Sequence, residues 1–337
     1  MSRNVIALFI ILSFAIVAVA CSGPIASTSS KIDPREVFSP LGEMVIPEDN
    51  PMTPEKIELG KLLYFDPRLS GDDTLSCASC HAPEKGWSDK RRTFLGFQGN
   101  VGARNSPSII NSGYYSLQFW DGRMKTLEEQ ALGPIQDKGE MNSNLEKLLV
   151  ELSDIPEYVE RFDQVFNSEI TSENLAKAIA AFERTIVIND TAFDKYLAGD
   201  ENALSAQAKA GMDLFVGKAN CVQCHNGASL TDNNFHNVGM DSEDLGRAKF
   251  TLNPEDTGKV KTPALRGIGQ TMPYMHNGKL ATLHEVVEFF DRGGDKHEMQ
   301  SVLIQPLSLS NKEKANLVAF LESLTGDELI IEVPDLP

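Results

Sequence analysis

Four of the five cysteines fall into two identical patterns. They read Cys77-Ala78-Ser79-Cys80-His81 and Cys221-Val222-Gln223-Cys224-His225. Each is a C-x-x-C-H pentapeptide, in which both thiols can add to the vinyl groups of a haem while the adjacent histidine binds the iron. A Cys₂His₂ zinc site would need a second histidine a few residues further on, and none follows His81 or His225 nearby. We therefore expect two covalently attached c-type haems.

Similar segments lead into both cysteine patterns. Residues 58–65 read ELGKLLYF, and residues 209–215 read KAGMDLF. In both, apolar residues recur at helical spacing and the segment ends in an aromatic residue. This repetition indicates one amphipathic helix used twice to deliver the chain to a haem. The sequence therefore predicts a mainly α fold of two cytochrome c-like haem domains, with long loops and few short strands.

Apolar periodicity and capping residues predict the remaining elements. Helices are expected over residues 145–152, 157–166, 172–185, 205–215, 283–290 and 311–324, with Ser172 as the cap of the third. Residues 80–113 are rich in Gly, Pro, Asn and Lys, which favours irregular structure. We expect an N-terminal haem domain over 33–187, with 326–337 packing back on it, and a C-terminal haem domain over 188–325.

The N-terminus is typical of an exported protein. Residues 1–20 carry an apolar run that ends in small residues, which is too short to span a membrane and resembles a secretory signal. Cys21 follows directly, and residues 21–32 form a Ser/Thr-rich tether. Cys21 is either the lipidated first residue of a bacterial lipoprotein, which would anchor the chain to a membrane, or an odd thiol left by ordinary cleavage.

The charge of the chain limits its partners. The formal net charge is −17. Binding to nucleic acid needs clustered Lys and Arg that replace the counterions of phosphates, so a nucleic-acid partner is not expected. A positively charged protein partner suits this surface better.

From about Glu58 to the C-terminus, the sequence resembles the bacterial di-haem cytochrome c peroxidases and the related di-haem enzyme that matures a quinone cofactor. Its marks, in order, are FDPRLS at 65–70, RNSP at 104–107, FWDGR at 119–123, GPIQ at 133–136, EM at 140–141, IPEY at 155–158 and PYMHNG at 273–278. The resemblance implies that the N-terminal haem reduces H₂O₂ and that the C-terminal haem stores and relays electrons.

The resemblance also assigns roles to single residues. Glu140 matches the distal glutamate that moves a proton during peroxide cleavage, and Gln130 matches the distal glutamine. Pro134 shapes the pocket between them. Trp120 matches a tryptophan between the haems that could relay electrons. The alternative readings are a solvated surface carboxylate for Glu140 and a core aromatic for Trp120.

Two binding sites follow from the same resemblance. Asn105, with the backbone carbonyls of Thr271 and Pro273, matches an inter-domain calcium site, and oxygen ligands suit calcium. Arg266, in the segment PALR at 263–266, is a candidate partner for a haem propionate, and a surface arginine is the alternative reading.

The sequence departs from the family pattern twice. Residues 95–100 contain no histidine to close the first haem, so we expect that haem to be open to peroxide without prior reduction. Phe290 stands where the family has a Met or Tyr ligand of the second haem, and phenylalanine cannot bind iron. Met299, His297 and Met275 are the candidate replacement ligands.

The sequence leaves three functions open. The leading hypothesis is a di-haem peroxidase that takes electrons from a small cytochrome c or cupredoxin on the periplasmic side of a bacterial membrane. The second is a di-haem oxidase that directs high-valent iron at a protein or organic substrate. The third is a non-catalytic electron carrier with two closed haems. A homodimer is expected by resemblance alone.

Overall fold

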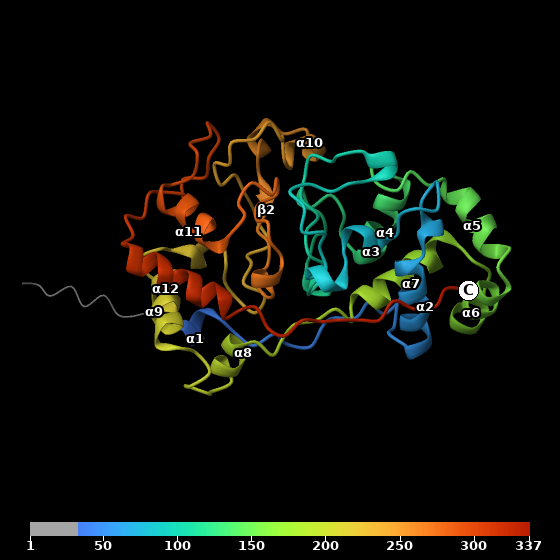
Figure 1. Cartoon of the computed structure of the whole chain (residues 1–337), viewed down its shortest axis with the longest axis horizontal. Coiled ribbons are helices and arrows are strands. Elements are labelled where there is room, and N and C mark those ends of the chain that lie inside the picture. The colour runs from blue at the N-terminus through green and yellow to red at the C-terminus, as the bar shows by residue number, and fades with distance from the viewer. Residues whose placement is uncertain (1–32) are drawn as a thin grey trace, which may run out of the picture. The chain divides into compact units, whose positions relative to one another are not determined.

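The computed structural model describes residues 33–337 (Figure 1). The predicted signal peptide, the tether and Cys21 lie outside the described residues. The described part is mainly helical, with long loops and one antiparallel pair of two-residue strands. This confirms the predicted fold class. None of the helices in residues 33–337 is long and apolar enough to cross a membrane.

The secondary structure consists of short helices that long irregular segments connect. The α-helices are α1 (Pro34–Val37), α2 (Pro54–Phe65), α3 (Cys77–Cys80), α4 (Leu127–Gln136), α5 (Leu145–Ser153), α6 (Pro156–Phe166), α7 (Ser172–Glu183), α8 (Ala192–Leu197), α9 (Ala206–Val216), α10 (Ala248–Thr251), α11 (Leu283–Asp291) and α12 (Asn311–Glu322). The strands are β1 (Phe235–His236) and β2 (Val260–Lys261). Most predicted helices match within two residues. Ser172 does not cap α7, because the side chain of Thr171 accepts the capping hydrogen bond from Asn174 N.

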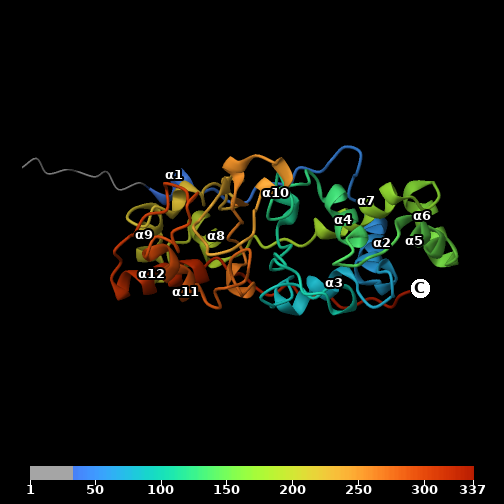
Figure 2. The same cartoon turned by 90° about the horizontal axis from the view of Figure 1, so that it is seen from above.

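The helices gather into two lobes. In both views α2 and α4 to α7 lie together at one end, and α8, α9, α11 and α12 lie together at the other (Figures 1 and 2). We call these the first and second lobe. In the first lobe, α2 packs along α7 around a core that includes Leu59, Leu63 and Ile179. In the second lobe, α9 packs along α12 around Phe215 and Phe320.

The two lobes repeat one packing device. Gly60 of α2 faces α7, where an added Cβ would overlap the carbonyl oxygen of Ala178 and press on Phe182. Gly211 of α9 faces α12, where an added Cβ would overlap the carbonyl oxygen of Asn316 and press on Phe320. In each lobe, therefore, a glycine lets the helix before a C-x-x-C-H pattern pack against the backbone of a second helix, α7 in the first lobe and α12 in the second. This places both patterns at equivalent positions.

The N-terminal end of the described chain differs from the predicted domain boundary. Phe38, just after α1, packs against Phe193, Phe215 and Phe320, with ring centroids 5.3–6.4 Å away. Residues 33–38 were expected in the N-terminal haem domain, but they lie on the second lobe. The cause is the aromatic cluster of the second lobe, which buries a large apolar ring completely.

The C-terminal segment runs from α12 back to the first lobe (Figure 1). The indole Nε1 of Trp87 donates a hydrogen bond to the Leu329 carbonyl at 3.0 Å, and Leu329 and Ile331 pack against the cluster around Tyr64 and Trp87. Arg68 Nη1 donates to the Pro337 carbonyl at 3.0 Å. The chain therefore crosses between the lobes at both ends.

Candidate active site

A large cavity joins the two cysteine patterns. Its volume is about 1300 Å³, and its wall includes Cys80 and His81 from one pattern and Cys221, Cys224 and His225 from the other. Sites for a single small molecule usually span roughly 300–1,000 Å³. Cys77 does not line the cavity and packs instead beside the Tyr64 cluster. The cavity is therefore larger than a usual site for one small molecule, and both C-x-x-C-H patterns contribute residues to its wall.

The first pattern is held by α2 and α3. Ser76 and Ser79 form a capping box at the start of α3, and the His81 N–H donates to the Cys77 carbonyl at 3.0 Å. The Tyr64 hydroxyl donates to the His81 carbonyl at 2.6 Å. Burial lowers the pKa of His81, which keeps the imidazole neutral. A neutral imidazole is the form that binds iron.

The second pattern presents a histidine in one defined tautomer. His225 Nδ1 lies 2.9 Å from the Leu230 carbonyl, to which it donates its proton. This hydrogen bond leaves Nε2 without a proton and free to bind a metal, as is usual for ligating histidines. Burial lowers the pKa of His225 as well. The four cysteines at 77, 80, 221 and 224 are free thiols, so all are available for attachment.

These residues fit two covalent haems. The donor set is two thiols and one neutral imidazole in each lobe, and the shared cavity is largely apolar in its lining. Arg266 adds a second observation, because its buried Nη2 has no hydrogen-bond partner among the described residues although it lies on the cavity wall. A buried guanidinium nitrogen without an acceptor fits an anionic group in the cavity.

Gln130, Pro134 and Glu140 line the same cavity as His81. Gln130 and Pro134 lie one turn apart on α4, so they share a face of that helix. Pro134 has no N–H to donate to the Gln130 carbonyl, yet α4 continues to Gln136. Glu140 follows in the turn after α4, where its N–H donates to the Asp137 carbonyl at 3.1 Å. The structure therefore brings these three predicted residues together.

The Glu140 carboxyl is tuned toward neutral pH. Burial raises its pKa to about 7, with Asp137 adding to the shift and Arg123 opposing it. A carboxyl with a pKa near the working pH is the group best suited to accept and return a proton. Glu140 is half-buried on the cavity wall, which favours the proton-transfer role over that of a freely solvated carboxylate.

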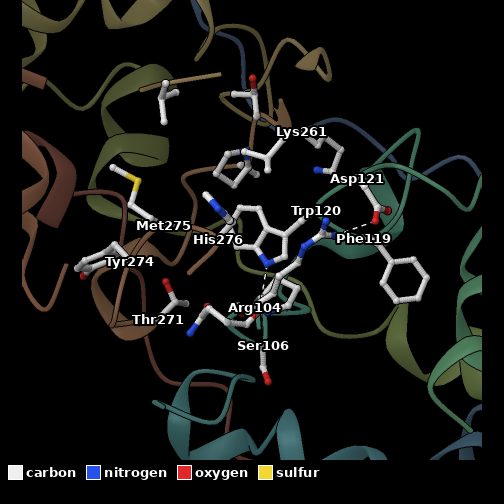
Figure 3. Close-up of a pocket in the computed structure, with 18 of the residues that line it drawn as sticks. Arg104, Ser106, Phe119, Trp120, Asp121, Lys261, Thr271, Tyr274, Met275 and His276 are labelled. Carbon is white, nitrogen blue, oxygen red and sulfur yellow. Dashed lines mark hydrogen bonds and ion pairs between the residues drawn. The ribbon is translucent and has the colours of Figure 1, made fainter. Parts of the chain in front are cut away.

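Trp120 lies on the cavity wall between the lobes (Figure 3). Its indole Nε1 donates to the Asn105 carbonyl at 2.9 Å, and its ring lies edge-on to His276 with centroids 6.4 Å apart. Arg104 lies beside it, donating to Asp121 at 2.7 Å and to Asp244 at 2.6 and 2.9 Å. Because Asp244 belongs to the second lobe, this ion-pair network ties the lobes together around Trp120.

The residues of the predicted calcium site also lie on this wall. Asn105, Thr271 and Pro273 all line the cavity. Asn105 Nδ2 donates to the Arg91 carbonyl at 2.8 Å, and the Asn105 N–H donates to the His276 carbonyl at 2.7 Å. The side chain is thereby fixed through its nitrogen, which leaves the amide oxygen as the atom that a cation could use.

Arg266 is buried, so its reading as a surface arginine is wrong. Its guanidinium pairs with Asp194 through a short contact, and its Nε donates to the Ala228 carbonyl at 2.9 Å. The remaining Nη2 is the nitrogen without a partner described above. A haem propionate would have to share this arginine with Asp194.

The candidate ligands of the second haem lie in different places. Phe290 of α11 lines the cavity, and so does Met275. Met299 and His297 do not line it. The Met299 side chain is 42% exposed, and His297 Nδ1 lies 3.0 Å from Asn237 Nδ2 and accepts a hydrogen bond from Met299 N at 3.1 Å. The structure therefore disfavours Met299 and His297 as ligands.

Comparison with known proteins agrees with this geometry. Residues 54–202 match the family model described as di-haem cytochrome c peroxidase, and residues 208–325 match the model described as cytochrome c. The chain is 39% identical to cytochrome-c peroxidase IdrP1 of Pseudomonas sp. strain SCT, over 92% of each chain. The chain belongs to the di-haem cytochrome c peroxidase family.

Other members of this family include proteins of the MauG type. The chain is 41% identical to the methylamine utilization protein MauG of Methylorubrum extorquens, over 86% of this chain and 84% of that one. A crystal structure of a MauG-like protein associated with microbial copper homeostasis is similar, with a TM-score of 0.79 and 33% identity over 84% of this chain and 93% of that one. Membership confirms the predicted family, its two c-type haems and an oxidoreductase of the cytochrome-c peroxidase type.

Two cavity residues of this di-haem peroxidase were missed by sequence reasoning. Lys261 of β2 and Glu183 at the end of α7 are both buried and both line the cavity. Burial raises the pKa of Glu183 to about 8, and one carboxyl oxygen has no partner in the described part of the chain. Glu183 follows the apolar run 178–182, which is a weak signal for any single charge, and nothing comparable surrounds Lys261.

One further group could hold a metal ion among the residues that the structure describes. It consists of Cys224, Asp232 and His236, whose ligand atoms lie within 4.8 Å of one another. His236 Nε2 lies 2.8 Å from Asp232 Oδ2. Because Cys224 belongs to a haem-attachment pattern, its sulfur is committed to the haem in this family, and the group is not a separate metal site.

Proposed function

We propose that this protein reduces H₂O₂ to water at the haem of His81, with electrons that arrive through the haem of His225. The balanced reaction takes one H₂O₂, two electrons and two protons to two water molecules. The observation that carries the proposal is the Glu140 carboxyl, whose pKa of about 7 places a proton-transfer group on the same cavity wall as His81, Gln130 and Pro134. A carrier with no turnover has no use for such a group.

The residues around His81 have separate tasks in this proposal. When bound, the two haems supply the iron that cleaves the O–O bond and store the electrons for the reaction. Glu140 takes the proton from one peroxide oxygen and returns it to the other, which becomes water. The Gln130 amide donates a hydrogen bond that orients the peroxide. The Pro134 ring is rigid and adds no polar side-chain group to this face of α4.

The site is ready for peroxide in the oxidised protein. The segment 95–100 that closes the first haem in family members with an activating histidine contains none here. Its contribution to the cavity wall is Asn100, next to Val101 and Gly102. None of these side chains is a ligand of haem iron, so they would leave the haem of His81 accessible to a small molecule.

Electrons enter through the second lobe. We propose that Trp120, between the two patterns, carries them from the haem of His225 to the haem of His81. The donor is a small cytochrome c or cupredoxin with a positively charged docking face, because the chain carries a formal net charge of −17. In this proposal the enzyme works on the periplasmic side of a bacterial membrane and is anchored there through Cys21. Calcium binds at Asn105, Thr271 and Pro273, and the protein is a homodimer.

A second candidate function is oxidation of a protein or organic substrate. Two observations favour it, namely the 41% identity to MauG and the absence of a histidine at residues 95–100. Phe290 argues against it, because the quinone-maturing branch has a tyrosine ligand at this position. Peroxide reduction with an added small electron donor separates the two, since an oxidase specialised for a large substrate turns over slowly with that donor.

Replacement of Glu140 tests the proposal. The Glu140→Gln holoprotein should retain both haems and lose peroxide reduction by about 10²- to 10⁴-fold, the usual contribution of a general acid-base group. Glu146→Gln is the matched control, because Glu146 is an exposed carboxylate in the first turn of α5. Equal turnover in the two variants would remove Glu140 from the reaction, whereas absence of turnover in the wild-type holoprotein would favour the carrier function.

A further inference from the structure

Lys261 places a positive charge inside the cavity. The residue is 6% exposed and lies on the cavity wall. Its Nζ lies 4.2 Å from the centroid of the Tyr115 ring, which belongs to the first lobe. The ammonium of a second-lobe residue therefore reaches across the cavity to a first-lobe aromatic ring (Figure 3 shows Lys261 with Trp120 and His276).

The ammonium has no anionic partner in the described part of the chain. None of the ion pairs or side-chain hydrogen bonds of residues 33–337 involves Lys261 Nζ. Asp232 raises its pKa only through a longer-range attraction, and burial lowers that pKa to about 8. The side chain thus carries its charge at neutral pH in a place that disfavours charge.

The Tyr115 ring is not sufficient to offset this burial. The attraction of a cation to an aromatic face is weaker than the loss of hydration that a buried ammonium suffers. Buried charges in folded proteins are normally paired with an opposite charge. Because no carboxylate of the described residues pairs with Lys261 Nζ, an anionic group in the cavity would supply the missing partner.

The backbone keeps Lys261 at this place. Its N–H donates to the Trp120 carbonyl at 2.7 Å, and the next residue, Thr262, donates its N–H to the Asn234 carbonyl at 2.9 Å. The Thr262 carbonyl accepts a hydrogen bond from the Thr231 hydroxyl at 2.7 Å. Strand pairing of β2 with β1 adds to this. These bonds fix the backbone of Lys261 beside Trp120, so that its side chain starts from the cavity wall.

We propose that Lys261 binds a carboxylate side group of a haem at the wall between the two haem-attachment patterns, and so sets the reduction potential of that haem. The residues of this cavity fit two haems, and each haem carries propionate carboxylates. The fixed positive charge favours addition of an electron, since reduction lowers the positive charge of the iron. The proposal rests on haem occupancy in this family and does not depend on which substrate is turned over.

The test measures the midpoint potentials of both haems by optical redox titration of the holoproteins. Lys261→Met should lower the potential of one haem, and Lys261→Arg should restore it to near the wild-type value. Lys259→Met is the matched control, because Lys259 lies two residues away, does not line the cavity and pairs with Asp256 near the surface. Resonance Raman bands of the haem propionates should shift in Lys261→Met and remain in place in Lys259→Met.

Two outcomes would overturn the proposal. If both potentials in Lys261→Met equal those in Lys259→Met, Lys261 has no influence on either haem. If the wild-type potential changes with chloride concentration while the propionate bands of Lys261→Met stay unshifted, the anion is a free ion from solvent. Neither result depends on peroxide turnover, so failure of this proposal and failure of the peroxidase proposal are distinguishable.

Discussion

The indole Nε1 of Trp120 donates a hydrogen bond to the backbone carbonyl of Asn105, with nitrogen and oxygen 2.9 Å apart. This bond joins the residue proposed to relay electrons to the residue proposed to bind calcium. It also fixes the plane of the indole against His276, whose own carbonyl accepts the Asn105 N–H. A substitution of Trp120 should therefore change both the rate of electron transfer and the free energy of unfolding.

Trp120→Phe tests this relationship. The phenyl ring keeps most of the packing but leaves the Asn105 carbonyl without its donor, which should lower the free energy of unfolding by about 1–3 kcal/mol. Electron transfer from the haem of His225 to the haem of His81 should slow, while haem content stays at two per chain. Flash photolysis or stopped-flow mixing of the half-reduced protein measures the rate. An unchanged rate with lowered stability would make Trp120 a core residue only.

The pH dependence of the peroxide reaction follows from Glu140. Its pKa is raised to about 7 by burial, and only the ionised carboxylate can accept a proton from H₂O₂. The second-order rate constant for peroxide should therefore rise as the pH increases through about 7 and level off above it. In Glu140→Gln this rise should disappear. A wild-type profile that is flat between pH 6 and pH 8, a range that extends about one unit on either side of that pKa, would contradict the assignment.

The glycine contacts of the two lobes predict matched losses of stability. Gly60→Ala and Gly211→Ala both force a methyl group against a backbone carbonyl, so each should lower the free energy of unfolding by about 1–3 kcal/mol or more. Gly42→Ala is the control, because an added Cβ there meets no atom within 4 Å. Thermal unfolding of the three holoproteins gives the comparison. Equal melting temperatures for all three variants would mean that α2 and α7, and α9 and α12, can move apart to accept a methyl group without a loss of stability.

The coordination of the second haem can be examined by substitution on the cavity wall. Phe290→Met should convert that haem to a low-spin, six-coordinate state, because Phe290 lines the cavity and stands where the family resemblance implies a Met or Tyr ligand. Met299→Leu should leave the EPR and optical spectra unchanged, since Met299 lies outside the cavity. Met275→Leu distinguishes the remaining candidate. A spectral change in Met299→Leu would show that this segment moves into the cavity when haem is bound.

Much of this architecture is predictable from the sequence because local signals carry it. The C-x-x-C-H patterns specify the haem attachment, and the helices before them follow from apolar periodicity and from the caps Thr53 and Ser205. The order of short motifs places Gln130 and Glu140 in one site. These features depend on residues close together in the chain or on a resemblance that covers most of it.

The remainder depends on contacts between distant segments. Phe38 could pack on either lobe, and only the three-dimensional aromatic cluster of the second lobe decides between them. The burial of Lys261 depends on how β2 meets the first lobe, which no local pattern encodes. The exclusion of Met299 from the cavity likewise depends on the path of a loop. Sequence separation of the partners is the common reason that these features were not predicted.

The reaction of the fully oxidised holoprotein with one equivalent of H₂O₂, without reductant, tests the central claim most directly. Stopped-flow optical spectra and EPR of samples frozen after mixing follow both haems. The account predicts a high-spin haem signal before mixing that is consumed at once, and a loss of this fast phase in Glu140→Gln. Two low-spin haems that do not react with peroxide would contradict it and would make the protein an electron carrier.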